Sequence, residues 1–137
     1  MTISPAAAGH PVSQGWSEFS FPEEPYYNNY CGTDGNRLGP NVTAIATSPL
    51  PPEAPKREVV ARTIERSDSG RGFGIVMPHF YKNWAVDDLR RLILNGIVWT
   101  AKREVPADGV DTARPDLAAF QPQSIEPLSH PAPRKTA

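Results

Sequence analysis

Apolar side chains recur at helical spacing over residues 83–102, and this is the strongest pattern in the chain. Asn83 is a favourable N-cap residue, acidic side chains follow it near the positive end of the helix dipole, and Pro106 prevents continuation. A glycine inside this run indicates close packing against a neighbouring element. The pattern predicts one long helix that is buried on more than one side. The positions on its main apolar face are Val86, Leu89, Ile93, Gly96 and Ile97.

Alternation of apolar and polar residues with period two predicts the strands. The clearest strand lies at residues 57–66, which are rich in β-branched side chains. The turn Ser67-Asp68-Ser69-Gly70 follows it and leads into an apolar strand at residues 72–77. These two strands are expected to pair as an antiparallel hairpin. Shorter alternations at residues 18–21 and 42–47 predict two further strands.

Proline sets the expected limits of the ordered part. The chain has 16 prolines, concentrated in residues 40–55 and again from Pro106 onward, and proline fixes φ and removes a backbone donor. Residues 1–9 show no sustained pattern and are expected to be a disordered leader. Residues 111–137 hold too few apolar groups to offset the entropy of ordering, so a proline-rich disordered tail is expected there. One domain over residues 10–110 remains.

Charge and cysteine content weigh against several classes of protein. The formal net charge is -1 and the 14 basic residues are spread along the chain, which disfavours binding to nucleic acid or to an anionic membrane. The longest apolar stretch, residues 89–99, is interrupted by polar residues and is too short to span a bilayer. The N-terminus lacks the features of a signal peptide, so a cytoplasmic protein is expected. The only cysteine, Cys31, rules out an intrachain disulfide and is expected to be inert.

The predicted elements are few for the apolar surface that they carry. A helix that is apolar on most sides needs a sheet and further elements to cover it, and this chain supplies one helix and three or four strands. We therefore expect either part of a larger domain, or a protein partner or second copy that covers the apolar helix.

The strand at residues 72–77 ends in a loop that carries His79 and leads directly into the helix. Ligands and catalytic groups gather at such strand ends in α/β folds. His79 is therefore the first candidate for a catalytic general base or a metal ligand. The alternative is a histidine that fixes the loop by bonding to a backbone carbonyl. Asn83 can orient His79 or a ligand, although its N-cap role alone explains it.

Motifs in this order resemble a known family. Over residues 10–110 the chain is similar to the C-terminal half of a ThuA-like (trehalose utilisation) domain, a branch of the class I glutamine amidotransferase-like superfamily. The resemblance implies an α/β fold, namely part of a flavodoxin-like sheet with a hairpin and one long C-terminal helix. The motifs are His10-Pro11-Val12, Tyr26-Tyr27-Asn28, Arg57-Glu58-Val59-Val60-Ala61, Gly70-Arg71-Gly72-Phe73-Gly74, His79-Phe80, Asn83-Trp84, the run from Asp87 to Thr100, and Val105-Pro106.

The resemblance also implies a role in carbohydrate metabolism, with a trehalose-type disaccharide or a keto-sugar as ligand. His79 takes the place of the family's pocket-facing histidine, whereas Tyr81 stands where the family commonly has a second one. Glu24, Tyr26 and Tyr27 resemble the family's acidic and aromatic loop, which would bind sugar hydroxyls. The alternative for this loop is a surface segment pinned by its aromatic rings.

Two further expectations concern chemistry. His10 could join His79 as a ligand of a divalent cation, either zinc or manganese. No Gly-x-Cys-x-Gly or Gly-x-Ser-x-Gly turn is present in the sequence, which argues against a glutamine amidotransferase. The alternative to sugar utilisation is a non-catalytic remnant or an interaction module that needs a partner to complete its core.

Overall fold

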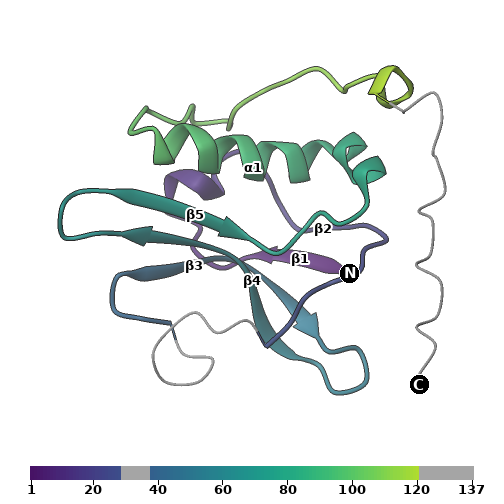
Figure 1. Cartoon of the computed structure of the whole chain (residues 1–137), viewed down its shortest axis with the longest axis horizontal. Helices are drawn as coiled ribbons and strands as arrows, with labels where there is room; N and C mark the ends of the chain where they lie inside the picture. Colours follow the sequence, from purple (N-terminus) through teal and green to yellow (C-terminus); the bar gives the residue numbers. More distant parts are fainter. Residues whose placement is uncertain (29–37, 121–137) are drawn as a thin grey trace, which may run out of the picture.

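The computed structural model describes residues 1–28 and 38–120, and Cys31 lies outside them. One sheet of five strands forms the base of the molecule in this part, in the order β2-β1-β3-β4-β5, and every pair of neighbouring strands is antiparallel (Figure 1). The strands are β1 (Thr2–Pro5), β2 (Phe19–Ser20), β3 (Val42–Leu50), β4 (Lys56–Glu65) and β5 (Arg71–Ile75). The helical elements are η1 (Pro11–Ser13), η2 (Tyr81–Ala85), α1 (Asp87–Thr100) and η3 (Leu117–Phe120).

The structure is thus mixed α/β, with a hairpin and one long helix, as the sequence predicts. The parallel strands of a flavodoxin-like sheet are not seen in the residues described. The predicted hairpin is the β4–β5 pair, in which Arg62 lies opposite Gly74 and Thr63 opposite Phe73. The amide of Arg66 donates to the Gly70 carbonyl at 2.8 Å and closes the turn.

The expectation that residues 1–9 are a disordered leader is wrong. Thr2–Pro5 forms β1, which lies between β2 and β3 in the sheet. Ile3 is fully buried in the core. A strand of four residues is too short to show a period of its own, and it is ordered here by hydrogen bonds to a strand on each side.

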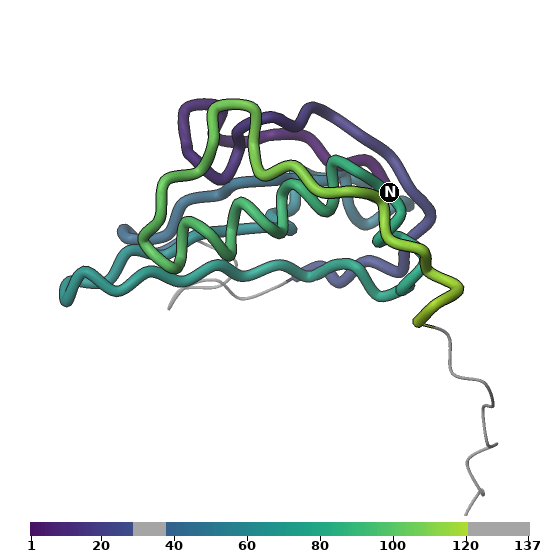
Figure 2. Tube along the Cα trace, turned by 90° about the horizontal axis from the view of Figure 1, so that it is seen from above, coloured from purple at the N-terminus to yellow at the C-terminus, as the bar shows by residue number. Residues whose placement is uncertain are grey.

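Helix α1 lies over one face of the sheet (Figure 2). Its Gly96 rests against the Phe73 ring of β5, so closely that an added Cβ would overlap the ring. This confirms the close packing that a glycine in the helix predicted. The buried apolar residues are Leu89, Leu92, Ile93 and Trp99 of the helix, Ile3, Ile45, Ala46, Leu50, Val60 and Ala61 of the sheet, and Val12, Trp16, Phe21, Met77 and Val105 of the connections.

The helix begins four residues later than predicted, and Asn83 is not its N-cap. Val86, in extended conformation and without a capping side chain, occupies that position. The preceding residues form the separate 3₁₀ helix η2 instead. The side chain of Asn83 bonds to the residue 22–23 segment, so a tertiary contact takes the place of the local cap.

The chain covers more of α1 than its predicted elements suggested. Asn95 is fully buried, and its amide nitrogen donates to the carbonyls of Val12 at 3.2 Å and Gln14 at 2.8 Å. Its carbonyl accepts from the amide of Val110 at 2.8 Å. The connection between β1 and β2 and the segment that follows α1 are therefore both hydrogen-bonded to one helix side chain. Ile97 remains 57% exposed on the same helix.

The first part of the expected tail is placed against the domain. Residues 117–120 form η3, and the Tyr81 hydroxyl donates to the Leu117 carbonyl at 3.4 Å. Residues 121–137 of the expected tail lie outside the described part. No helix among the residues described has the length and apolar character that crossing a bilayer requires.

Candidate functional site

The loop that follows β5 meets the segment of residues 22–28 and encloses a shallow hollow of about 310 Å³. Its volume lies at the lower end of the range for small-molecule sites. His79 and Tyr26, both singled out from the sequence, line it from two different segments, and Tyr26 is 59% exposed. The lining residues are Tyr26, Ile75, Val76, Met77, Pro78 and His79.

Glu24 and His79 form the polar pair of this site. The Nε2 atom of His79 lies 3.3 Å from the Glu24 Oε2 atom, and the two side chains are 48% and 69% exposed. The imidazole also lies edge-on to the Phe80 ring, with centroids 5.1 Å apart. The pair is open to solvent, so its mutual attraction adds little to stability. Both groups are consequently accessible to a ligand.

Glu23 is the residue that sequence reasoning missed. One of its carboxylate oxygens accepts from the amide of His79 at 3.0 Å and from the Asn83 side chain at 3.0 Å. The other accepts from the amides of Glu24 at 2.8 Å and Phe80 at 3.4 Å. Glu23 therefore joins the two loops of the site. The only sequence signal for it is an acidic pair between Pro22 and Pro25.

These hydrogen bonds stabilise the ionised form of the Glu23 carboxyl group. Its partial burial by itself raises the pKa, but the hydrogen bonds from Glu24, Asn83, His79 and Phe80 outweigh burial and leave the pKa below its ordinary value. The carboxylate is thus ionised near neutral pH and can hold both loops.

Asn83 has a positioning role in the structure. Its side chain is 3% exposed and donates to the Pro22 carbonyl at 2.8 Å as well as to Glu23. Because Asn83 is buried, its side chain has no exposed surface with which to make the expected contact with a ligand. Tyr27, the remaining candidate, is exposed but is not among the residues that line the hollow.

His10 lies at the other end of α1 and does not approach His79. Its Nδ1 atom accepts from the Val12 amide at 3.1 Å, its Nε2 lies 3.4 Å from Thr63 Oγ1, and its ring packs 5.0 Å from that of Trp99. Trp99 is in the last turn of α1, whereas His79 precedes its first turn, and a helix of 14 residues is about 20 Å long. The prediction of a zinc or manganese site shared by His10 and His79 is therefore wrong.

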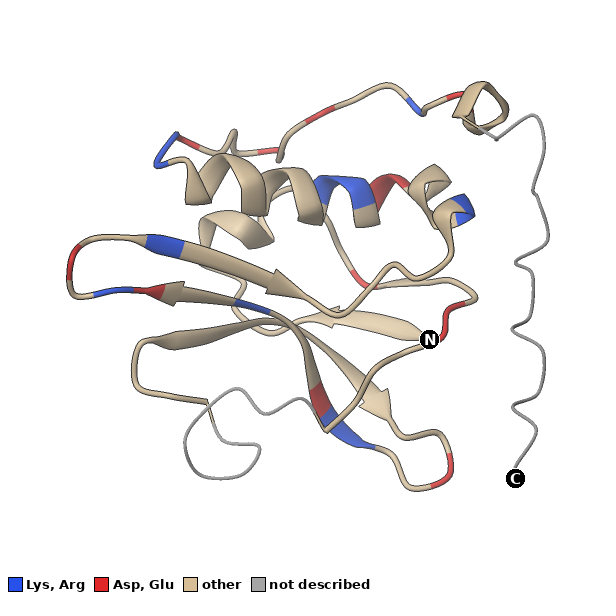
Figure 3. Ribbon diagram, in the orientation of Figure 1, with Lys and Arg blue, Asp and Glu red and all other residues tan. Residues whose placement is uncertain are grey.

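The other charged residues of the described part form neither a continuous patch of one sign nor a metal site. Basic and acidic residues alternate over the described ribbon without a continuous stripe of either sign (Figure 3). No group of three or more His, Cys, Asp or Glu side chains suited to a metal ion occurs in residues 1–28 and 38–120.

The lowered pKa of His10 leads us to expect that the stability of the protein depends on pH. Burial lowers its pKa below 6.5, with a smaller opposing effect of Glu65 and a further lowering by Arg71. The unfolded chain therefore takes up this proton first, so stability should be constant above about pH 6.5 and fall as the pH decreases through the window below it. Urea unfolding at about pH 7.5 and pH 5.5 measures the difference.

The control for this effect is His10→Asn, because an asparagine oxygen can accept from the Val12 amide without titrating. Its loss of stability between the two pH values should be smaller than that of the natural chain. An equal loss in both proteins would show that other groups carry the pH dependence.

Comparison with known proteins returns no relative for this arrangement of residues. No family model, no curated protein sequence and no solved structure matches the chain.

Proposed function

We propose that the hollow beside Tyr26 and His79 binds a sugar, of the trehalose-type disaccharide or keto-sugar class that the resemblance to ThuA-like domains implies. The observation that carries the proposal is the convergence of Glu24, His79 and Tyr26, which lie on two segments more than fifty residues apart. A neutral polyol is recognised by hydrogen-bond donors and acceptors combined with an aromatic surface. These three side chains supply that combination.

The architecture of the two loops supports a binding site over a chance contact. Glu23 accepts from the backbone amides of His79 and Phe80, and Asn83 in turn donates to Glu23, while the functional groups of Glu24 and His79 stay accessible. Ordering of the supporting groups before binding lowers the entropic cost of binding. If the sugar is transformed, His79 is the general base, because its Nε2 atom faces the Glu24 carboxylate and its other ring nitrogen can accept a hydroxyl proton.

Titration of the full ¹⁵N-labelled chain with trehalose and with a ketohexose tests the proposal. We expect saturable shifts of the amide signals of Glu24, His79 and Phe80 with at least one of the sugars. Glu24→Gln and His79→Ala should each weaken binding by about tenfold, because each removes a hydrogen bond that involves an ionisable group.

Glu53→Gln is the matched control, since Glu53 is exposed in the β3–β4 turn away from the hollow. It should bind as the natural chain does. If neither sugar produces saturable shifts, or if Glu53→Gln weakens binding as much as Glu24→Gln does, the proposed sugar site is wrong.

A second candidate function is that of an interaction module. One observation favours it: Ile97 is 57% exposed beside β5, an edge strand of the sheet, whereas the other apolar residues of α1 are buried or half-buried. Sugar binding and protein binding would use different surfaces, so the two candidates do not compete.

A further inference from the structure

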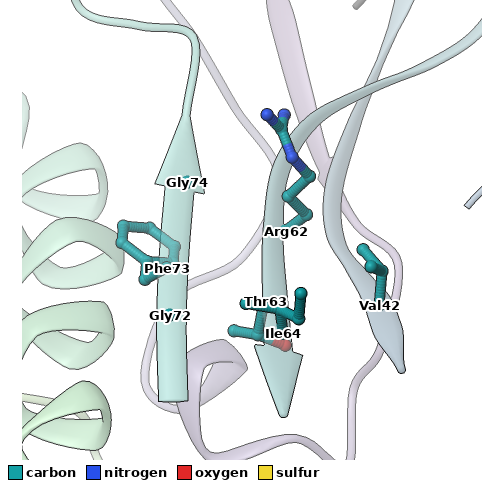
Figure 4. Close-up of a pocket in the computed structure, with 7 residues that line it drawn as sticks. All are labelled: Val42, Arg62, Thr63, Ile64, Gly72, Phe73 and Gly74. Atoms are coloured by element: carbon teal, nitrogen blue, oxygen red, sulfur yellow. The ribbon is translucent and has the colours of Figure 1, made fainter. Parts of the chain in front are cut away.

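Strand β5 forms one edge of the sheet in the part of the chain that the structure describes. It is the last strand of the sheet order, and Figure 4 shows it as the outermost strand, with β4 on one side and only the helix beside it on the other. Natural sheets protect such edges with bulges, prolines or inward-pointing charges. The sequence Arg71-Gly72-Phe73-Gly74-Ile75 contains no proline, and the register to β4 runs without a bulge.

The hydrogen-bonding groups on this edge can be assigned from the β4–β5 ladder. The amide of Arg66 bonds to the Gly70 carbonyl at 2.8 Å, and the amide of Val76 bonds to the Val60 carbonyl at 3.0 Å. Bonded and non-bonded pairs alternate in an antiparallel ladder, so the even-numbered residues of β5 face β4. The backbone groups of Arg71, Phe73 and Ile75 therefore point to the free edge. No partner for these groups is present in the part of the chain that the structure describes.

An apolar hollow of about 370 Å³ adjoins this edge. Phe73 of β5 lines it together with Gly96, Ile97, Thr100 and Ala101 at the end of α1. A strand added beside β5 would lie about 4.8 Å from it, beneath Ile97. One apolar side chain of that strand, placed opposite Phe73 and directed toward the helix layer, would enter the hollow.

The charges at one end of the edge favour an acidic neighbour. Arg71 starts β5, and Lys102 and Arg103 follow the end of α1 and line the same hollow as Arg71. Arg71 pairs with Glu65 at 3.7 Å. Lys102 attracts the Asp68 carboxylate, and Glu104 lines the same hollow. Cations still outnumber carboxylates among the residues that line this hollow, so the end near Arg71 favours an acidic side chain.

We propose that the β5 edge and Ile97 bind an extended segment of another polypeptide, which adds a strand to the sheet. The segment carries an apolar side chain at its centre and an acidic residue at the end near Arg71. Pairing with β5 of a second copy is disfavoured, because α1 stands directly on Phe73 and two such helices would meet over the joined strands. The proposal rests on the interaction-module function and is independent of sugar binding.

The probe is the peptide acetyl-Thr-Glu-Thr-Ile-Thr-Glu-Thr-amide. Its two glutamates lie on the same face as the central isoleucine, so that one of them reaches Arg71 in either strand direction. Hydrogen exchange of the full chain is followed by NMR with and without the peptide. We expect slower exchange at the amides of Arg71, Phe73 and Ile75, and unchanged exchange at Gly72 and Gly74, whose amides already bond to β4. The same peptide methylated on its backbone nitrogens should not bind.

Ile97→Lys should raise the dissociation constant of the peptide about tenfold or more, since it places a charge in the apolar wall. Ile64→Lys is the matched control, because Ile64 pairs with Gly72, the neighbour of Phe73, and its side chain therefore lies on the opposite face of the sheet from Phe73. It should bind as the natural chain does.

Three outcomes would overturn the proposal. One is the absence of peptide binding while the natural chain is folded, and another is equal weakening by Ile97→Lys and Ile64→Lys. The third is protection of Arg71, Phe73 and Ile75 that appears without peptide and rises with protein concentration, which would assign the edge to a second copy. Loss of sugar binding in the Glu24 and His79 variants has no bearing on any of them.

Discussion

Replacing Asn95 with leucine is expected to lower the free energy of unfolding by about 4 kcal/mol. The substitution removes three hydrogen bonds at once, and it leaves the Gln14 carbonyl and the Val110 amide without their partner, whereas the Val12 carbonyl keeps the Trp16 indole N–H at 2.9 Å. Leucine has a similar volume, so packing does not account for the loss. For a domain of this size the melting temperature should fall by about 15 °C or more, measured by circular dichroism and confirmed by urea unfolding.

Asn41→Leu is the control for this prediction. The Asn41 side chain makes a single exposed hydrogen bond, to the Glu65 carbonyl at 3.2 Å. Its replacement should change stability by less than about 0.5 kcal/mol. A similar melting temperature for Asn95→Leu and the natural chain would show that η1 and the segment around Val110 are not held to the helix through Asn95.

Gly96→Val is expected to destabilise the protein by about 2 kcal/mol. The new Cβ would overlap the ring of Phe73, an aromatic side chain with no free end to bend away. Valine has a higher helix propensity than glycine, and that gain of a few tenths of a kcal/mol offsets only part of the clash. Thermal and urea unfolding measure the net effect.

A double-mutant cycle identifies Phe73 as the cause. In a Phe73→Leu background, Gly96→Val should cost about 1 kcal/mol less than in the natural chain. Ile97→Val, at the neighbouring exposed position, should be close to neutral. Additive costs in the cycle would contradict close contact between α1 and β5 at Gly96.

Local patterns predicted the elements best where one segment decides its own structure. The β4–β5 hairpin follows from β-branched alternation and a turn, and the core of α1 follows from its apolar period. The predicted start of α1 was wrong because the Asn83 side chain can bond either to a nearby helix amide or to a distant segment. Its side chain bonds to Pro22 and Glu23, about sixty residues away, in place of a nearby helix amide.

The candidate site was predicted in part. The sequence indicated His79, Glu24 and Tyr26. The structure brings His79 and Tyr26 to one hollow and places Glu24 3.3 Å from His79. From the sequence we also paired His10 with His79, although the length of α1 separates these two residues in the structure. Glu23 was missed because its role consists of accepting backbone amides from a distant loop, which depends on no recognisable spacing.

The sequence by itself determined the helix, the hairpin and the identity of the residues that can do chemistry, because periodicity and residue type act over a few neighbours. Only the tertiary structure decided that residues 2–5 form an inner strand, that Asn95 and Glu23 fasten distant segments, and that β5 keeps a free edge beside Ile97. These features depend on which hydrogen-bonding groups find partners far along the chain. Such pairing is settled by the whole fold and leaves no periodic signal in the segments that take part.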